Sequence, residues 1–216
     1  DGQRGLALYF PIINSAGKVW LNGELAGQRG IVNANRDIYQ PKLSSLIVSV
    51  PEKVREVEII VQAVNYSFYS SGVGQSPQIN TPAAILTMLN TTNGIENFFA
   101  GCLIALCLYQ FILFFIYQRG KPHLWLAMIC AGVALRAMVV HGGSFLLPDL
   151  FPNVSLEAWK KIEFGSVYAT MAFFPLYVYY LFNSVAPRKP LWFFIGAASI
   201  MVLIVLLTPQ YTYGSF

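Results

Sequence analysis

The chain has 216 residues, a formal net charge of +4, 56% hydrophobic residues and only 11% charged residues. Soluble domains carry about 25% charged residues, so this composition, with a mean hydropathy of +0.54, excludes an ordinary soluble protein. The charge is modest and no basic block occurs, which excludes a typical nucleic-acid-binding protein.

Residues 1–79 carry β signals and are expected to form an extracellular or periplasmic domain, a partial β-sandwich of the jelly-roll type. Apolar runs separated by Gly, Pro or Asn turns occur at residues 6–10, 18–21, 46–50 and 54–64. Asn22 and Gly23 lie between two such runs and predict a tight hairpin, because both residues tolerate positive φ. Residues 54–64 alternate, with Val57, Ile59, Val61 and Ala63 expected on the buried face.

Loop residues of this domain are candidates for ligand contact, because carbohydrate recognition uses aromatic and planar polar side chains. The candidates are Arg29, Asn33, Asn35, Arg36, Tyr66 and Tyr69. The same residue types also line the rim of any β-sandwich, so a purely structural role stays open. Asn22 and Gly23 are interpreted as turn residues only.

The β region resembles the later half of a galactose-binding-like jelly roll. The segments that carry the resemblance are LYFPIINSAGKVWLNGELAGQRG, NRDIYQP and REVEIIVQAVNY. The hairpin with its following strand also resembles the sugar-binding domains of some glycoside hydrolases. The resemblance implies a small, possibly carbohydrate ligand.

Residues 80–94 are expected to be a linker, with Asn and Thr at 90–93 offering helix caps. A polytopic α-helical membrane domain then follows over residues 95–216. Runs of about 20 apolar residues can cross a membrane, because a helix satisfies its own backbone polar groups. The four expected spans are residues 95–118, 124–141, 162–183 and 191–208.

The charges in the loops predict the orientation of these spans. The first loop, residues 119–123, is basic, and Arg188 and Lys189 precede the fourth span. Both loops lie on one side if all four helices span, and the positive-inside rule makes that side cytoplasmic. The β domain is therefore expected outside a bacterial inner membrane. The chain starts without Met and ends directly after a span, so we expect a piece of a longer protein.

Four ionisable residues near the ends of the spans are candidates for coupling between the β domain and the helices: Glu96, Arg136, His141 and Glu163. A cation within a span costs about 2.5–3.5 kcal/mol on the insertion scale, so Arg136 should have a partner. Glu163 on the next helix is the expected partner. A packing salt bridge or snorkelling toward the interface is the structural alternative. Gln110 is expected to form an interhelical hydrogen bond, and Pro175 to kink its helix.

The chain also resembles the bacterial seven-transmembrane receptors with diverse intracellular signalling modules. The residues that carry this resemblance are GIENFFAGCLIALCLYQFILFFIYQRGKPHLWLAMICAGVALRAM, then PDLFPN, then FGSVYATMAFFPLYVYYLF. It implies a jelly-roll sensor domain, a seven-helix bundle and a cytoplasmic output module such as a histidine kinase or diguanylate cyclase. The output would be two-component or cyclic-di-GMP signalling. Helices five to seven and any output module are not in this sequence.

No catalytic motif is present, so we expect no enzyme activity in the chain and no cofactor. His123 and His141 are expected on opposite membrane faces, and no metal site is predicted. The expected partners are membrane lipid and a small-molecule or carbohydrate ligand, and a homodimer is possible; nucleic acid is not expected. The leading hypothesis is the sensory and transmembrane part of a receptor. A transporter or polytopic membrane enzyme with an accessory β domain is the main alternative, and a structural membrane protein that binds another protein is a third.

Overall fold

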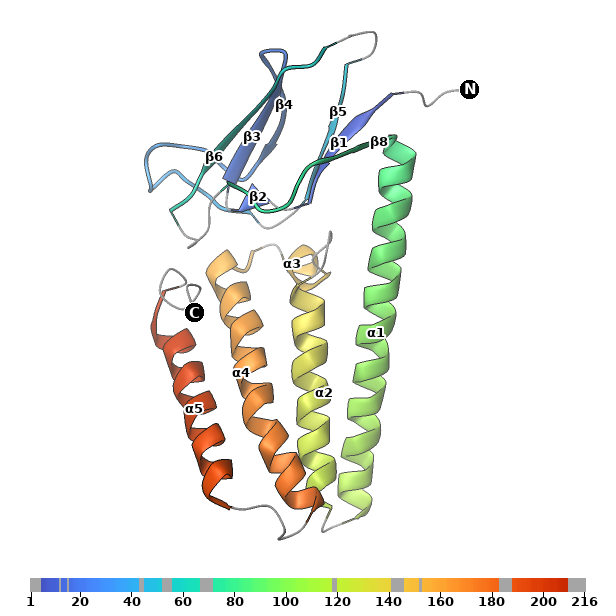
Figure 1. Cartoon of the computed structure of the whole chain (residues 1–216), viewed down its shortest axis with the longest axis vertical. Coiled ribbons are helices and arrows are strands. Elements are labelled where there is room, and N and C mark those ends of the chain that lie inside the picture. The colour runs from blue at the N-terminus through green and yellow to red at the C-terminus, as the bar shows by residue number, and fades with distance from the viewer. Residues whose placement is uncertain are drawn as a thin grey trace. The chain divides into compact units, whose positions relative to one another are not determined.

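The computed structural model describes residues 5–11, 13–14, 16–42, 45–51, 56–66, 72–117, 120–140, 146–151, 153–182 and 188–209. It consists of two compact units (Figure 1). The β unit comprises Asp1–Gly94, His141–Leu156 and Gln210–Phe216, and the helical unit comprises Ile95–Val140 and Glu157–Pro209. Tyr69 and His141, two of the residues singled out from the sequence, lie outside the described residues.

The β unit is built from short antiparallel strands. They are β1 (Ala7–Phe10), β2 (Ile13–Asn14), β3 (Ala16–Leu21), β4 (Glu24–Arg29), β5 (Leu46–Ser49), β6 (Ile59–Val64), β7 (Gly72–Val73) and β8 (Gln78–Asn80). Two three-stranded sheets have the orders β5-β1-β8 and β4-β3-β6, and β2 pairs with β7. This is a small antiparallel β structure, as the alternation of apolar runs and turns predicts.

The core of the β unit lies between the two three-stranded sheets. Leu8 and Phe10 of β1, Val48 of β5, and Val19 and Leu21 of β3 are all buried in one cluster. Side chains two apart on a strand share a face, so β1 directs Leu8 and Phe10 to this core. Ala7 and Tyr9 point to the opposite face of the same strand and are buried there in a second cluster.

The Asn22-Gly23 hairpin is confirmed. Leu21 pairs with Glu24 across the turn, and Asn22 and Gly23 have φ values of 50° and 83°. A type I′ turn has positive φ at both central residues, and its twist fits that of the flanking strands. The Asn22 side chain also accepts a hydrogen bond of 2.9 Å from the backbone N–H of Glu58, which fixes the entry into β6.

Strand β6 follows the predicted alternation only in part. Val57 and Val61 pack against the core, whereas Ile59 and Ala63, expected on the same face, are exposed. The strand lies at the edge of its sheet, next to β3 only, so part of its inward face has no opposing side chains to cover it.

Five helices follow: α1 (Pro82–Ile116), α2 (Lys121–Val139), α3 (Leu146–Leu150), α4 (Leu156–Leu181) and α5 (Arg188–Leu207). In the helical unit α1, α2, α4 and α5 lie side by side in chain order (Figure 1). The linker expected at residues 80–94 is instead helical from Pro82 onward, so α1 is longer than the sequence interpretation gave.

The early start of α1 has a local cause. The Thr81 hydroxyl accepts a hydrogen bond of 3.3 Å from the backbone N–H of Ala84, as an N-cap does, and Pro82 occupies the first helical position. The Asn and Thr residues at 90–93, expected as caps, lie within the helix. Gly94 does not end the helix, because a helix interior tolerates glycine at a cost of about 1 kcal/mol relative to alanine.

Two of these helices, α1 and α2, are long and apolar enough to cross a membrane within the described residues. The apolar part of α5, Leu191–Leu207, is shorter. Helix α4 starts with Glu157, Lys160, Lys161 and Glu163 and contains several tyrosines, which make it less apolar than α1. The structure thus supports a membrane region, and two of the four expected spans stand out by their length and composition.

Candidate functional site

The 30–42 loop of the β unit holds most of the residues that the sequence suggested for ligand contact. Ile31 and Gln40 pair across it, with N–H to C=O distances of 2.8 and 3.2 Å. Gly30 opens the loop with φ 66°, and a Cβ there would clash with the Gln40 carbonyl oxygen. Only glycine adopts that backbone at so close an approach without strain. The two ends of the loop are therefore held together by the pairing of Ile31 with Gln40.

The asparagines of this loop satisfy their own backbone. The Asn33 side-chain oxygen accepts a hydrogen bond of 2.8 Å from the Asn35 N–H, and the Asn35 side-chain oxygen accepts one of 3.0 Å from Asp37. Such local turns are a common use of asparagine in loops. The two side chains therefore shape the loop.

Two tyrosines fasten the loop to the end of β6. The Tyr66 hydroxyl donates a hydrogen bond of 2.6 Å to the Ala34 carbonyl, and its ring meets Tyr39 edge to face at 5.2 Å between centroids. Tyr39 is buried, and its hydroxyl has no hydrogen-bond partner. An aromatic pair of this geometry contributes about 0.5–1.5 kcal/mol beyond the area it buries.

Arg29, at the end of β4, is the most unusual residue of the β unit. It is 2% exposed, and its Nε donates a hydrogen bond of 2.9 Å to the Lys42 carbonyl. Its terminal nitrogens Nη1 and Nη2 are buried without a hydrogen-bond partner. Burial lowers the pKa of Arg29 to about 10, against a smaller opposing effect of Tyr9. The guanidinium therefore stays charged at neutral pH inside the β unit.

Tyr9 of β1 lies within electrostatic reach of this charge. Burial raises the pKa of Tyr9, while a hydrogen bond with the Ser45 side chain and the charge of Arg29 act in the opposite direction. The four apolar residues of β1 gave no sign in the sequence that Tyr9 would serve as more than a core residue. Tyr39 was also missed, although it is an aromatic loop residue of the same kind as Tyr66.

Of the six residues proposed for ligand contact, Arg29, Asn33, Asn35 and Tyr66 lie in the 30–42 loop or bond to it. Arg36 is exposed on the same loop. The structure thus gathers them in one region, and ligand binding itself stays a prediction.

The junction between β8 and α1 belongs to the β unit and joins its sheet directly to the long helix. Strand β8 pairs with β1, and only Thr81 separates β8 from α1. Ile85, in the first turn of α1, is 1% exposed and packs with Ala7 and Tyr9 of β1, and Leu89 lies against the same cluster. The sheet therefore holds the start of the helix by hydrogen bonds through β8 and by apolar packing through Ile85.

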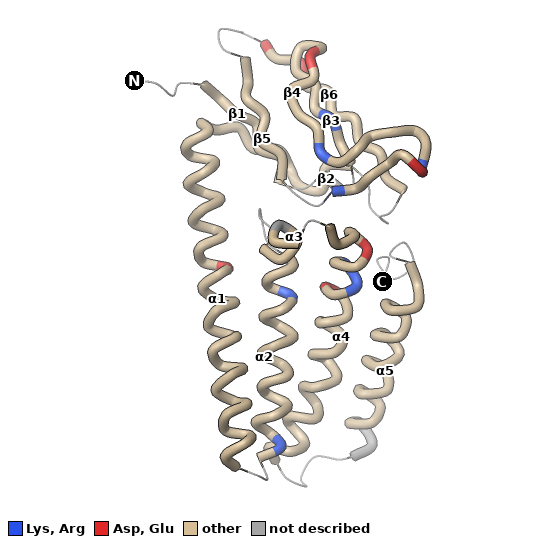
Figure 2. Tube along the Cα trace, turned by 180° about the vertical axis from the view of Figure 1, so that it is seen from behind, with Lys and Arg blue, Asp and Glu red and all other residues tan. Residues whose placement is uncertain are grey.

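The charges of α2 and α4 lie near the ends of these helices, whereas α1 carries a single charged residue, Glu96, between its two ends (Figure 2). Where α4 begins, the Lys160 ammonium lies 2.6 Å from a Glu163 carboxylate oxygen, and Lys161 lies 3.1 Å from Glu157. Glu163 is buried and Lys160 largely so.

The expected pairing of Arg136 with Glu163 is wrong. Arg136 is in the last turn of α2 and exposed, whereas Glu163 pairs with Lys160. Lys160 is one turn before Glu163 on the same helix, so the two side chains meet without an approach between helices. Glu96 is half-buried on α1. A coupling role for Glu96, Arg136 and Glu163 stays a prediction.

Contacts between neighbouring helices fix the bundle. Gln110 of α1 and His123 of α2 form a hydrogen bond of 2.8 Å, which confirms the interhelical bond expected of Gln110. Cys107, Ala127 and Cys130 form the apolar contact between the same helices. Between α2 and α4, a Cβ at Gly132 would clash with the Thr170 hydroxyl, so the two backbones approach closely there. Small residues at such crossings are typical of membrane helices.

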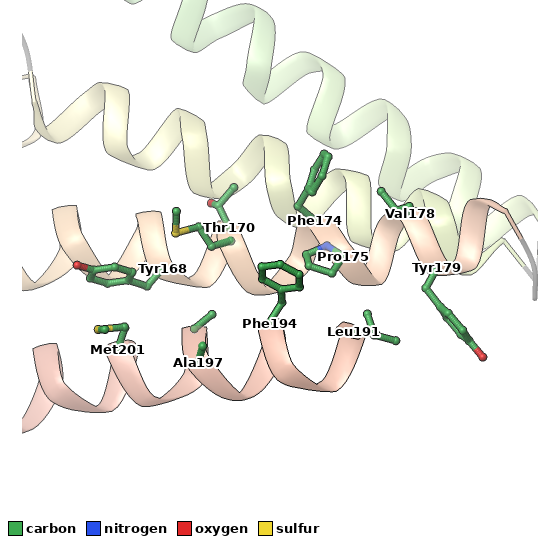
Figure 3. A pocket seen from close by; sticks show the side chains of 12 residues that line it. Tyr168, Thr170, Phe174, Pro175, Val178, Tyr179, Leu191, Phe194, Ala197 and Met201 are labelled. Carbon is green, nitrogen blue, oxygen red and sulfur yellow. The ribbon is translucent and has the colours of Figure 1, made fainter. Parts of the chain in front are cut away.

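A cavity of about 800 Å³ lies between α4 and α5 (Figure 3). Phe174 and Pro175 of α4 and Phe194 and Ala197 of α5 contribute to its walls, and no charged residue lines it. Pro175 lacks the N–H that would bond the Met171 carbonyl within α4, and Met171 also lines the cavity. The lining of this cavity is therefore mostly apolar.

These features define a class: a membrane protein in which a small β unit precedes apolar helices. Residues 92–216, more than half of the chain, match a family model described as 7TM diverse intracellular signalling. The chain belongs to this family, and its helical region is a membrane region of the signalling-receptor type. The resemblance to the seven-transmembrane receptors with diverse intracellular signalling modules is thereby confirmed. No curated protein and no solved structure was found to match the chain.

Proposed function

We propose that the chain is the sensory and transmembrane part of a bacterial signalling receptor. The β unit senses a small ligand of the carbohydrate class outside the inner membrane. The helices relay its binding to an output module in the cytoplasm. The chain itself carries out no enzymatic reaction in this proposal, because its polar residues serve folding and recognition.

The junction of β8 with α1 is the observation that supports this proposal most. Helix α1 is one of the two candidate spans, and its first turns are held by the β sheet. A ligand can shift an equilibrium only through a difference in affinity for two conformations. A change in the sheet that moves β1 and β8 would also move the start of α1, because Ile85 packs on β1 and only Thr81 separates β8 from the helix.

All four long helices cross the membrane in this proposal. Helices α1 and α5 expose phenylalanine, leucine and isoleucine side chains. These side chains would promote aggregation in water, whereas the hydrocarbon core of a membrane solvates them. Four crossings with basic residues at 119–123 and 188–189 on the inner side leave the β unit outside. The transporter alternative gains no support from the α4–α5 cavity, whose lining has no charged residue.

Cysteine labelling in intact cells tests this topology. The three native cysteines are replaced by alanine, and single cysteines are placed at the exposed positions Glu24, Lys121 and Asn153. A membrane-impermeant maleimide should label Glu24→Cys and Asn153→Cys in intact cells, and Lys121→Cys only after permeabilisation. Labelling of Lys121→Cys from outside, or protection of Glu24→Cys, would overturn the proposed orientation.

A further inference from the structure

Arg29 is a buried cation without a counter-charge. Between residues 5 and 94, the acidic residues that the structure describes are all exposed: Glu24, Asp37, Glu56 and Glu58. Among the residues that the structure describes, none of these carboxylates forms an ion pair with Arg29, and neither Nη1 nor Nη2 has a hydrogen-bond partner. Buried charges in proteins are otherwise paired, because desolvation strongly disfavours an isolated one.

The unsatisfied atoms of Arg29 have a definite geometry. Nε is occupied by the Lys42 carbonyl, which orients the plane of the guanidinium. The two remaining nitrogens form a planar fork that matches the two oxygens of a carboxylate in a bidentate pair. Tyr39, on the 30–42 loop whose base Arg29 holds, has a second buried donor without a partner in its hydroxyl group.

We propose that Arg29 is the anion-binding residue of the sensor site and that the ligand carries a carboxylate, as a sugar acid does. This rests on the proposed function of the β unit as a ligand sensor, and it names the class of ligand. The carboxylate supplies the missing counter-charge. The 30–42 loop must move for it to enter, because the guanidinium is covered in this structure.

The loop is fastened in a way that allows such a movement. The bonds of Ile31 with Gln40 and of Tyr66 with Ala34 hold it, and its tip residues at 33–38 are exposed or half-buried. Release of the Tyr66 bond frees the tip while β4 and its pairing with β3 stay intact. Loops that open over a ligand typically have few such fastenings.

The test compares small anions with neutral molecules of the same shape. The full chain in nanodiscs of neutral lipid is heated with acetate, acetamide or inorganic phosphate at matched ionic strength. Unfolding of the β unit is followed by hydrogen exchange of its peptides. We expect acetate to raise the melting temperature of the β unit by several degrees, acetamide to have no effect, and phosphate to be weaker than acetate. Galacturonate should then bind at least tenfold more tightly than galactose.

Variants separate a binding role from a structural one. Arg29→Met should abolish the acetate effect while leaving the melting temperature without anion unchanged or higher, because an isolated buried charge has been removed. Arg29→Lys keeps the charge but loses the fork, and its acetate response should be at least tenfold weaker. Lys18→Met, which removes a cation from β3 outside the 30–42 loop, is the matched control and should respond as the wild type does.

Three results would overturn the proposal. They are an equal effect of acetate and acetamide, a preference for phosphate, or an acetate effect that survives in Arg29→Met. These outcomes do not depend on topology or signalling. The cysteine labelling experiment can therefore contradict the proposed topology while acetate still binds at Arg29. Equally, the labelling can support the topology while acetate does not bind.

Discussion

Replacement of Ile85 by alanine should release the start of α1 from the β sheet. Ile85 is 1% exposed and packs on Ala7 and Tyr9. An isoleucine-to-alanine change at a buried site costs about 2–5 kcal/mol, from lost apolar burial and the cavity left behind. We take about 3 kcal/mol here, because the site lies at the margin of the β unit and can partly collapse.

Hydrogen exchange of the full chain in nanodiscs measures this loss locally. If the first turns of α1 open independently of the rest, about 3 kcal/mol corresponds to exchange that is roughly a hundredfold faster. The effect should be confined to peptides that cover residues 82–94 and β1. Exchange in α2 should not change, since α2 shares no residue with this cluster.

Leu86→Ala is the matched control for this experiment. Leu86 follows Ile85 on the same turn of α1 but is 52% exposed, so its removal should change exchange less than threefold. The gain in helix propensity is larger for Ile85→Ala than for Leu86→Ala, so this contribution opposes the expected difference and does not create it. Equal exchange in Ile85→Ala and Leu86→Ala would refute the view that Ile85 anchors the helix to the sheet.

Three further changes test the turn and the bundle. Gly23→Ala should destabilise the β unit by about 1 kcal/mol in thermal unfolding, because Gly23 has φ 83° and alanine is strained there; Gly94→Ala, inside α1 with open space around it, should not destabilise the chain. Gly132→Leu should separate α2 from α4 and lower the melting temperature of the helical unit. Gly165→Leu is the control, because a side chain there meets no neighbour, and it should leave the melting temperature unchanged. An equal effect of the two variants would contradict the close crossing of α2 and α4. Lys160→Met should lower the free energy of unfolding by about 1–3 kcal/mol, because it leaves the buried Glu163 unpaired. Lys161→Met should lower it by less than about 1 kcal/mol, because its partner Glu157 is half exposed. Thermal unfolding in nanodiscs measures both, and an equal loss would contradict the stronger role of the Lys160–Glu163 pair.

Much of the architecture could be predicted from local patterns. The Asn22-Gly23 hairpin was predictable because two residues that tolerate positive φ decide it. The apolar helices were predictable because their length and composition are set by lipid and not by a partner. The Gln110 bond was expected for a similar reason, as an amide in a membrane helix needs a partner.

The start of α1 and the partner of Glu163 were not predicted correctly, for two different reasons. Residues 82–94 are helical because Thr81 caps the helix and Pro82 starts it, and because Ile85 and Leu89 pack on β1. The second cause is a tertiary contact that no local pattern shows. The Lys160–Glu163 pair was within reach, because a spacing of three residues on a helix already places the two side chains together. The sequence did not indicate the contact of Tyr9 with Ile85, because this contact depends on the pairing of β1 with β8, which precedes α1.

Strand β1 is the element that connects the proposed anion site with α1. Leu8 and Phe10 are locked in the core between the sheets, and Tyr9 between them faces Ile85 on the other side of the strand. A slip of β1 by one residue would exchange its two buried faces, so that Tyr9 would enter the core between the sheets and Leu8 and Phe10 would face Ile85. Because both faces are packed, β1 moves only as a rigid part of its sheet. Tyr9 also lies within electrostatic reach of Arg29. In the proposed mechanism, neutralisation of that charge by a carboxylate would act on the residue on which α1 packs, and a displacement of β1 with its sheet would pass to the helix through Ile85 without a change of strand register.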